Sequence, residues 1–169
     1  MDVTPVSGRR FGLTADTHDD LVDWPAILAS LKAAWSEVDG VIHCGDLTST
    51  AALPSLAAIA PSYATRSDGD PPATPPALSD GPRVLELGGA RVGLTFNLPE
   101  EAMSADGAAR LFGGPVAACV YGGTHEARLE EIGGVLFVNP GSPSLAKRRT
   151  AAILIADAGG VSAQIVDIG

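Results

Sequence analysis

Three short polar clusters in this chain combine residue types that can hold a metal ion. They are Asp16-Thr17-His18, Gly45-Asp46 and Gly122-Gly123-Thr124-His125. A carboxylate and an imidazole two residues apart can both turn toward one ion. A second carboxylate and a distant histidine would then complete a mixed set of oxygen and nitrogen ligands. Such a set suits Mn, Fe, Zn or Co better than Ca.

Each cluster taken alone also has an ordinary structural interpretation. A D-x-H sequence is often a turn aspartate beside a surface histidine, and a GD pair is often no more than a turn. The joint interpretation is favoured because each cluster follows an apolar run that is typical of a strand. Functional side chains collect at the carboxyl ends of strands in α/β sheets, so we expect the three clusters to meet.

The elements that must position these clusters alternate between β-type runs and helices. Residues 11–15 and 40–44 predict buried strands that end at the first two clusters, and residues 61–66 predict a third strand. A helix is expected from Trp24 or Pro25 to Ser36, because its apolar residues recur at helical spacing. A second helix is expected within 48–60, where a proline suits only the first turn or a break.

The second half of the chain is predicted to be mostly strand. A proline-rich loop over 67–82 precedes a hairpin around Gly88-Gly89, and a helix is expected over 100–112. Further strands are predicted at 116–121, 127–132, 135–139, 151–157 and 161–168. The pattern predicts an α/β protein with two mixed sheets packed face to face. A length of 169 residues suits a single domain spanning 1–169.

Composition excludes several classes of protein. Lys and Arg total 11 against 20 for Asp and Glu, a net charge of −9, which argues against binding a nucleic-acid duplex or an anionic membrane. The two cysteines are too few for a disulfide scaffold and are predicted to be buried free thiols. No apolar run is long enough to span a bilayer. We expect a cytoplasmic protein; an exported protein whose signal was removed is the alternative.

The runs LTADTHDD, VIHCGDL and VYGGTHEARLEEIGGVLFVNPGS resemble motifs of the calcineurin-like metallophosphoesterases, specifically the small YfcE-type phosphodiesterase branch. The family pattern is roughly SDTHG, HxGD, GNxD, HG, GHTH and NPGS, and the resemblance runs from about residue 9 to the final hairpin. It implies a four-layer α/β/β/α sandwich with metals at the loop ends. It also implies two metals that share a bridging aspartate, as in two-metal hydrolysis.

The resemblance assigns the first metal to Asp16, His18 and His125, with Asp46 as the bridge. Asp46 and His125 are also the catalytic residues that it implies. The asparagine ligand of GNxD corresponds to Asp68, whose extra negative charge favours a cation.

Two imidazole ligands of the family pattern are absent from this chain. The histidine of HG falls on Phe96, and the first histidine of GHTH falls on Gly123. Three residues nearby are alternative ligands for the second metal: Asn97, Glu100 and Asp70.

Four further residues are predicted to support the site or to contact substrate: His43, Arg66, Asn97 and Asn139. His43 either orients Asp46 or is a hydrogen-bonded core histidine. Arg66 is a candidate for steering an anion. Asn139 and Ser142 are expected to hold the GTH loop through backbone hydrogen bonds.

The resemblance implies a metal-dependent phosphoesterase that hydrolyses a small phosphodiester with a metal-activated water, at a reduced or mononuclear site. One or two divalent transition metals are expected, with manganese first and Fe, Zn, Ni or Co as alternatives. A catalytically inactive scaffold is the main alternative, because the retromer subunit with this fold serves as a scaffold. A nucleotide- or phosphate-sensing module is a third hypothesis, and the sequence predicts no oligomeric state.

Overall fold

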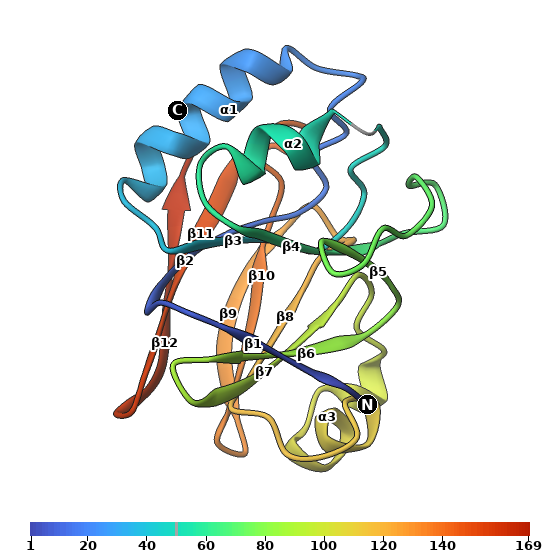
Figure 1. The fold of residues 1–169 in the computed structure, drawn as a ribbon, viewed down its shortest axis with the longest axis vertical. Helices are drawn as coiled ribbons and strands as arrows, with labels where there is room; N and C mark the ends of the chain where they lie inside the picture. Colours follow the sequence, from blue (N-terminus) through green and yellow to red (C-terminus); the bar gives the residue numbers. More distant parts are fainter. Residues whose placement is uncertain (50) are drawn as a thin grey trace.

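The computed structural model describes residues 1–49 and 51–169, which form two six-stranded sheets (Figure 1). Sheet I has the order β12-β11-β2-β3-β4-β5 and sheet II the order β1-β6-β7-β8-β10-β9. The strands of sheet I are β2 (Arg10–Thr14), β3 (Gly40–His43), β4 (Ser62–Arg66), β5 (Leu78–Asp80), β11 (Thr150–Asp157) and β12 (Gly160–Asp167). Those of sheet II are β1 (Val3–Val6), β6 (Arg83–Leu87), β7 (Ala90–Thr95), β8 (Ala118–Tyr121), β9 (Ala127–Ile132) and β10 (Val135–Pro140).

The two sheets bury a shared apolar core between them. Phe11 and Leu13 of sheet I lie in one cluster with Leu85, Leu94 and Val120 of sheet II, and all five side chains are fully buried. The central strands are covered on both faces, which explains why their sequences are nearly continuous apolar runs. The prediction of two mixed sheets packed face to face is confirmed.

Helices cover the outer faces of both sheets (Figure 1). On sheet I lie α1 (Trp24–Trp35) and α2 (Ala52–Ala57); on sheet II lie the 3-10 turn η1 (Glu100–Ala102) and α3 (Ala105–Leu111). Trp35 packs with Val41 beneath α1, and Phe112 packs with Phe137 beneath α3. The layers therefore follow the α/β/β/α order that the family resemblance implies.

The helix α1 begins as its sequence predicts. The Asp23 carboxylate accepts a hydrogen bond from the Ala26 amide at 3.2 Å, and Pro25 lies in the first turn. The other two predicted helices are shorter than expected: α2 spans six residues with Pro54 near its start. The stretch 100–112 is divided because Ser104 caps a new helix, accepting from the Gly107 amide at 3.0 Å.

Two strands were not predicted. β1 pairs in parallel with β6, and Val3 lies opposite Val84, so its partner is distant in the sequence. β5 lies within the segment 67–82 that was expected to be a loop, and it pairs with β4. Both strands are at sheet edges, where short strands and nearby prolines are tolerated.

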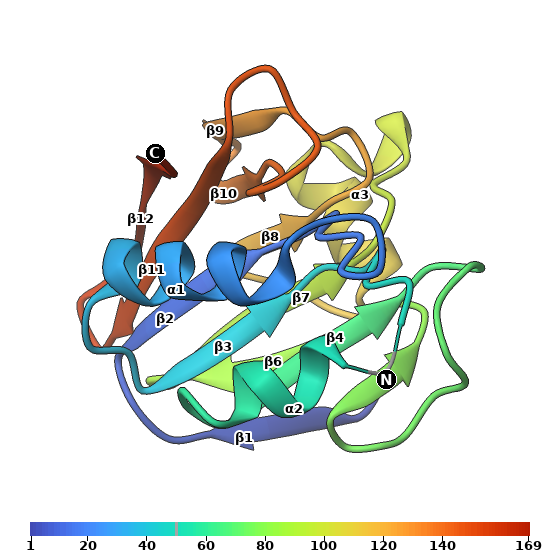
Figure 2. The same cartoon turned by 90° about the horizontal axis from the view of Figure 1, so that it is seen from above.

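The parallel strands bring the polar clusters to one rim. β2, β3 and β4 are parallel neighbours in sheet I, and β7, β8 and β10 are parallel neighbours in sheet II. Figure 2 shows the arrowheads of β3, β4 and β7 pointing the same way. Both cysteines are buried free thiols, as predicted. Within 1–49 and 51–169, no helix is long and apolar enough to cross a membrane.

Candidate metal centre

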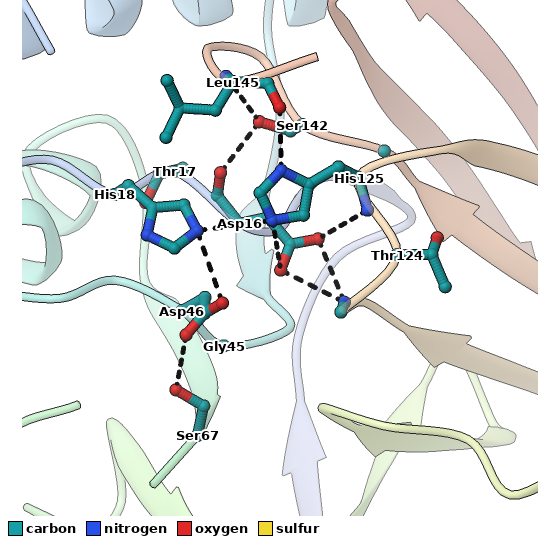
Figure 3. Close-up of polar contacts among 12 residues, drawn as sticks. Asp16, Thr17, His18, Gly45, Asp46, Ser67, Thr124, His125, Ser142 and Leu145 are labelled. Atoms are coloured by element: carbon teal, nitrogen blue, oxygen red, sulfur yellow. Dashed lines mark hydrogen bonds and ion pairs between the residues drawn. The ribbon is translucent and has the colours of Figure 1, made fainter. Parts of the chain in front are cut away.

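Four side chains converge at the rim: Asp16, His18, Asp46 and His125 (Figure 3). One ligand atom from each lies within 4.8 Å of the others. The Nε2 atom of His18 is 3.3 Å from Asp46 Oδ2 and 3.4 Å from the Nε2 of His125. Two carboxylates and two imidazoles form a mixed oxygen and nitrogen set, which fits a divalent transition metal. These are the four residues that the family resemblance assigned to the first metal.

The loops that carry these residues are held side by side by backbone hydrogen bonds. After β2, the Asp16 amide donates to the Gly45 carbonyl at 2.9 Å, and the His18 amide donates to the Asp46 carbonyl at 3.1 Å. Two residues on, the Asp19 amide donates to the Leu47 carbonyl at 3.0 Å. The loop after β2 therefore continues the parallel pairing of the sheet and fixes the spacing between the first two clusters.

All four converging residues have a left-handed backbone. Their φ angles are 51° for Asp16, 44° for His18, 60° for Asp46 and 60° for His125. Among the described residues only two other non-glycine positions, Ser36 and Thr48, have positive φ. Such conformations cost about 1–3 kcal/mol each and persist where the surrounding structure enforces them. The strain is therefore concentrated at the candidate centre.

Asp16 is fully buried and is held by several hydrogen bonds. Its carboxylate accepts from the Gly123 amide at 3.0 and 3.1 Å and from the His125 amide at 3.4 Å. Burial raises the pKa of Asp16 to about 6, and nearby His125 and the Gly123 hydrogen bond oppose that rise. A cation at the centre would offset the cost of keeping this buried carboxylate charged.

The hydrogen bonding of His125 leaves one ring nitrogen free to bind a metal. Its Nδ1 lies 2.8 Å from the Leu145 carbonyl, which can only accept, so Nδ1 carries the proton. The Nε2 lone pair then faces His18 and lies 3.9 Å from Asp16 Oδ1. A backbone carbonyl that fixes the tautomer in this way is typical of metal-binding histidines.

His43 lies beneath the centre and joins two of its loops. It is fully buried, and its Nδ1 accepts from the Gly45 amide at 3.1 Å, while its Nε2 contacts the Thr17 hydroxyl at 2.9 Å. Burial lowers the pKa of His43 to about 4, so the ring is neutral. The two interpretations of His43 thus coincide, because it is a hydrogen-bonded core residue that also holds the Gly45-Asp46 turn.

The chain matches the family model of the calcineurin-like phosphoesterase superfamily domain over residues 10–159. It belongs to this superfamily. A search of curated proteins finds no match.

Solved structures of the same fold include a Thermotoga maritima protein, with 27% identity, a TM-score of 0.68 and coverage of 95% of this chain and 99% of that one. An archaeal phosphodiesterase has 22% identity, a TM-score of 0.68 and coverage of 93% and 99%. Vps29 from Chaetomium thermophilum has 20% identity, a TM-score of 0.70 and coverage of 95% and 98%.

Asp68 does not belong to the four-residue cluster. Asp68 is exposed in the turn after β4, and it lines a hollow of about 300 Å³ together with Asp46 and Asn97. Asp70, an alternative ligand, uses its buried carboxylate to accept from the backbone amides of Asp46, Ser67 and Thr48 at 2.8–2.9 Å. Asp70 therefore fastens two loops together.

Arg66 is occupied by contacts within its own loop. Its guanidinium donates to the carbonyls of Asp70 and Pro71 at 2.8 Å each and to the Asp80 carboxylate at 3.0 Å. The predicted role of Arg66 in attracting an anion therefore competes with its role in holding the segment 67–80 in place.

Asn139 and Ser142 act on different loops from one another. The Asn139 amide donates to the Thr124 hydroxyl at 3.0 Å and so holds the GTH loop through a side chain. The Ser142 hydroxyl instead donates to the Asp16 carbonyl at 2.8 Å and accepts from the Leu145 amide at 3.0 Å. The expectation that both hold the GTH loop through its backbone is replaced by these contacts.

Of the other two residues suggested as substitute ligands, Asn97 lines the hollow that borders Asp46, whereas Glu100 lies elsewhere. Asn97 is exposed at the end of β7, and Glu100 begins η1 and lines a separate hollow beside β9. No motif points to Ser67, whose hydroxyl donates to Asp46 Oδ1 at 2.7 Å (Figure 3). Asp19 is a further residue of this kind: it is buried, and its carboxylate accepts from the Ser49 amide at 3.0 Å and from the Ser49 hydroxyl at 2.6 Å.

Proposed function

We propose that this chain is a metal-dependent phosphoesterase that hydrolyses small phosphodiesters. The observation that supports the proposal is the convergence of Asp16, His18, Asp46 and His125 within 4.8 Å. A divalent cation bound there would polarise a phosphoryl oxygen and lower the pKa of a bound water. Manganese is our first candidate, with Fe, Zn, Ni and Co as alternatives.

The chain's own residues set the charge and the shape of this site. Asp16 and Asp46 supply negative charge to hold a cation, and the Leu145 carbonyl keeps the proton of His125 on Nδ1. A hollow of about 510 Å³ beside His125 is lined by Leu145 and Lys147, among others. This space suits a small ester, with the Lys147 ammonium available to a phosphate oxygen.

The second candidate is a non-catalytic scaffold. The observation in its favour is that positions 96 and 123, where the family pattern has histidines, are Phe and Gly in this chain. The fold does not decide between the two, because it is shared with a phosphodiesterase and with Vps29.

A hydrolysis assay on bis(p-nitrophenyl) phosphate separates the two candidates. We expect turnover that depends on Mn²⁺ and falls by about 10²–10³-fold or more in His18→Ala and Asp46→Asn, since transition-state electrostatics carry losses of that size. Asp106→Asn, on α3 in the outer layer, is the matched control and should keep wild-type activity. An enzyme that turns over nothing with any of the five metals would favour the scaffold.

A further inference from the structure

We infer that this centre takes a single metal ion, because three side chains that line the hollow beside Asp46 offer a second ion no suitable set of ligands. They are Ser67, Phe96 and Asn97, from the loops after β4 and β7. The inference rests on the proposed function in treating the Asp16 cluster as a metal centre. It goes beyond that function by fixing the number of ions and the groups that replace the missing one.

Ser67 donates a hydrogen bond to Asp46, the residue that the family resemblance implies as a bridge between two metals. Asp46 Oδ2 faces the ring of His18 at 3.3 Å, while Asp46 Oδ1 accepts a hydrogen bond from Ser67 Oγ at 2.7 Å. The Ser67 amide is itself fixed by Asp70 Oδ2 at 2.9 Å, and the residue is buried. A short hydrogen bond to a carboxylate is among the stronger neutral-donor contacts. The second oxygen of Asp46 thus already has a proton donor, with which a second cation would have to compete.

Asn97 fills the space in which a side chain at position 123 would begin. A β-carbon built on Gly123 would overlap Asn97 Oδ1, and the φ of Gly123 is +89°, which side-chain-bearing residues rarely adopt. Loss of the histidine at 123 and the placement of the Asn97 amide are therefore two parts of one packing arrangement.

Phe96 is packed against the turn that carries Asp46. A β-carbon on Gly45 would lie 2.6 Å from Cδ2 of the Phe96 ring, so the ring and the glycine are in close contact. An apolar ring on the wall of the hollow beside Asp46 offers no ligand atom to an ion.

The chain also has no imidazole left for a second ion. Of its three histidines, His18 and His125 belong to the four-residue cluster, and both nitrogens of buried His43 are used by Thr17 and Gly45. The Asp70 carboxylate near Asp46 is used by backbone amides, and the hollow is otherwise lined by an exposed carboxylate and an exposed amide, Asp68 and Asn97. That set lacks the nitrogen ligands that favour a transition metal.

The number of bound ions tests this inference through a pair of designed variants. The rebuilt variant carries Ser67→Gly, Phe96→His, Asn97→Gly and Gly123→His, which restores the HG and GHTH motifs and the glycine of GNxD. The cleared variant carries Ser67→Gly, Phe96→Ala and Asn97→Gly, which opens the same space without adding imidazoles. Each protein is titrated with Mn²⁺ by calorimetry, and its metal content is measured after desalting.

We expect one Mn²⁺ per chain for the wild type and the cleared variant, and two for the rebuilt variant. Two ions on the wild type would overturn the inference, and so would two ions on the cleared variant, because bare space would then be enough. If the rebuilt variant does not fold, the Mn²⁺ spectrum of the wild type by electron paramagnetic resonance still decides. An isolated ion supports the inference and a spin-coupled pair overturns it.

Hydrolysis measured on the same samples keeps this inference separate from the proposed function. One bound ion without turnover leaves the inference standing and contradicts the phosphoesterase. Two bound ions with turnover contradict the inference and support the phosphoesterase. A wild type that binds no Mn²⁺ contradicts both.

Discussion

The two halves of the rim differ in how they hold their polar side chains. In the half formed after β2, β3 and β8, the four converging residues are buried or half-buried and have positive φ. In the half formed after β4 and β7, Asp68 and Asn97 are exposed, and Phe96 packs on a glycine. The side chains of the first half converge from a strained backbone, whereas those of the second half line an open hollow.

This difference indicates which half of the rim a bound ion would stabilise. Four left-handed residues at about 1–3 kcal/mol each, together with a buried Asp16, are costly unless something compensates for them. In the half after β4 and β7 the polar groups are paired without an ion, because the Asp70 carboxylate accepts from three backbone amides and the Ser67 hydroxyl donates to Asp46. Strained backbone that carries ligand atoms is thus a better mark of the functional half than the number of carboxylates.

The largest expected effect comes from making the same substitution in each half. Asp16→Asn removes a carboxylate from the cluster and should lower Mn²⁺-dependent hydrolysis by about 10²–10³-fold. Asp68→Asn changes an exposed side chain outside the cluster and should change the rate by less than about threefold, since exposed substitutions rarely matter. Initial rates and Mn²⁺ affinity by calorimetry measure both.

Equal losses of hydrolysis rate in Asp16→Asn and Asp68→Asn would contradict the difference between the two halves of the rim. They would mean that Asp68 binds the working ion even though it lies outside the four-residue cluster. Circular dichroism on both proteins ensures that a loss of activity is not a loss of fold.

A second prediction concerns the pH dependence of stability from His43. Its pKa is lowered to about 4 in the folded protein against 6.5 unfolded, so the unfolded state binds the extra proton between these values. Stability from this residue is full above pH 6.5 and declines as the pH falls to 4, by up to about 3 kcal/mol. His43→Gln keeps an acceptor for Gly45 and a donor for Thr17 but does not titrate.

The difference between wild type and His43→Gln isolates this effect, because Asp16 titrates in the same range in both metal-free proteins. Urea denaturation at a series of pH values measures it. We expect the free-energy advantage of the wild type to shrink as the pH falls from 7 to 4. A difference that stays constant with pH would show that His43 takes up no proton on unfolding.

Much of the fold could be predicted from local pattern. The helix α1 has apolar residues at helical spacing and a capping aspartate, and the central strands are short apolar runs. β1 could not be found, because its strand state depends on β6, which is distant in the sequence. β5 was hidden by the prolines around it.

The site divides in the same way. The four converging residues could be predicted, because they belong to short motifs that can be recognised in one sequence. The contacts of Ser67 and Asp70 could not be predicted, because each is a hydrogen bond between loops that only the folded chain brings together. The positive φ of Asp16 and His125 was hidden for the same reason, since neither residue type requires it.

Arg66 gives the smallest expected effect and sharpens the comparison within the half after β4 and β7. If its guanidinium only clamps the segment 67–80, Arg66→Gln should lower the free energy of unfolding by about 1 kcal/mol through lost hydrogen bonds. The KM for bis(p-nitrophenyl) phosphate should then stay within about twofold of the wild type at every ionic strength, because a guanidinium held by two carbonyls and Asp80 makes no contact with the substrate. Arg128→Gln, whose exposed side chain pairs with Glu130 on β9, is the matched control for removing one positive charge.

An arginine that steers the substrate would behave differently. Its loss would raise KM most at low salt and little at high salt, because attraction between exposed charges is screened by ions. A salt-dependent rise in Arg66→Gln that is absent from Arg128→Gln would therefore return Arg66 to the substrate site. The half after β4 and β7 would then contribute to function through charge, although it contributes no ligand to the metal.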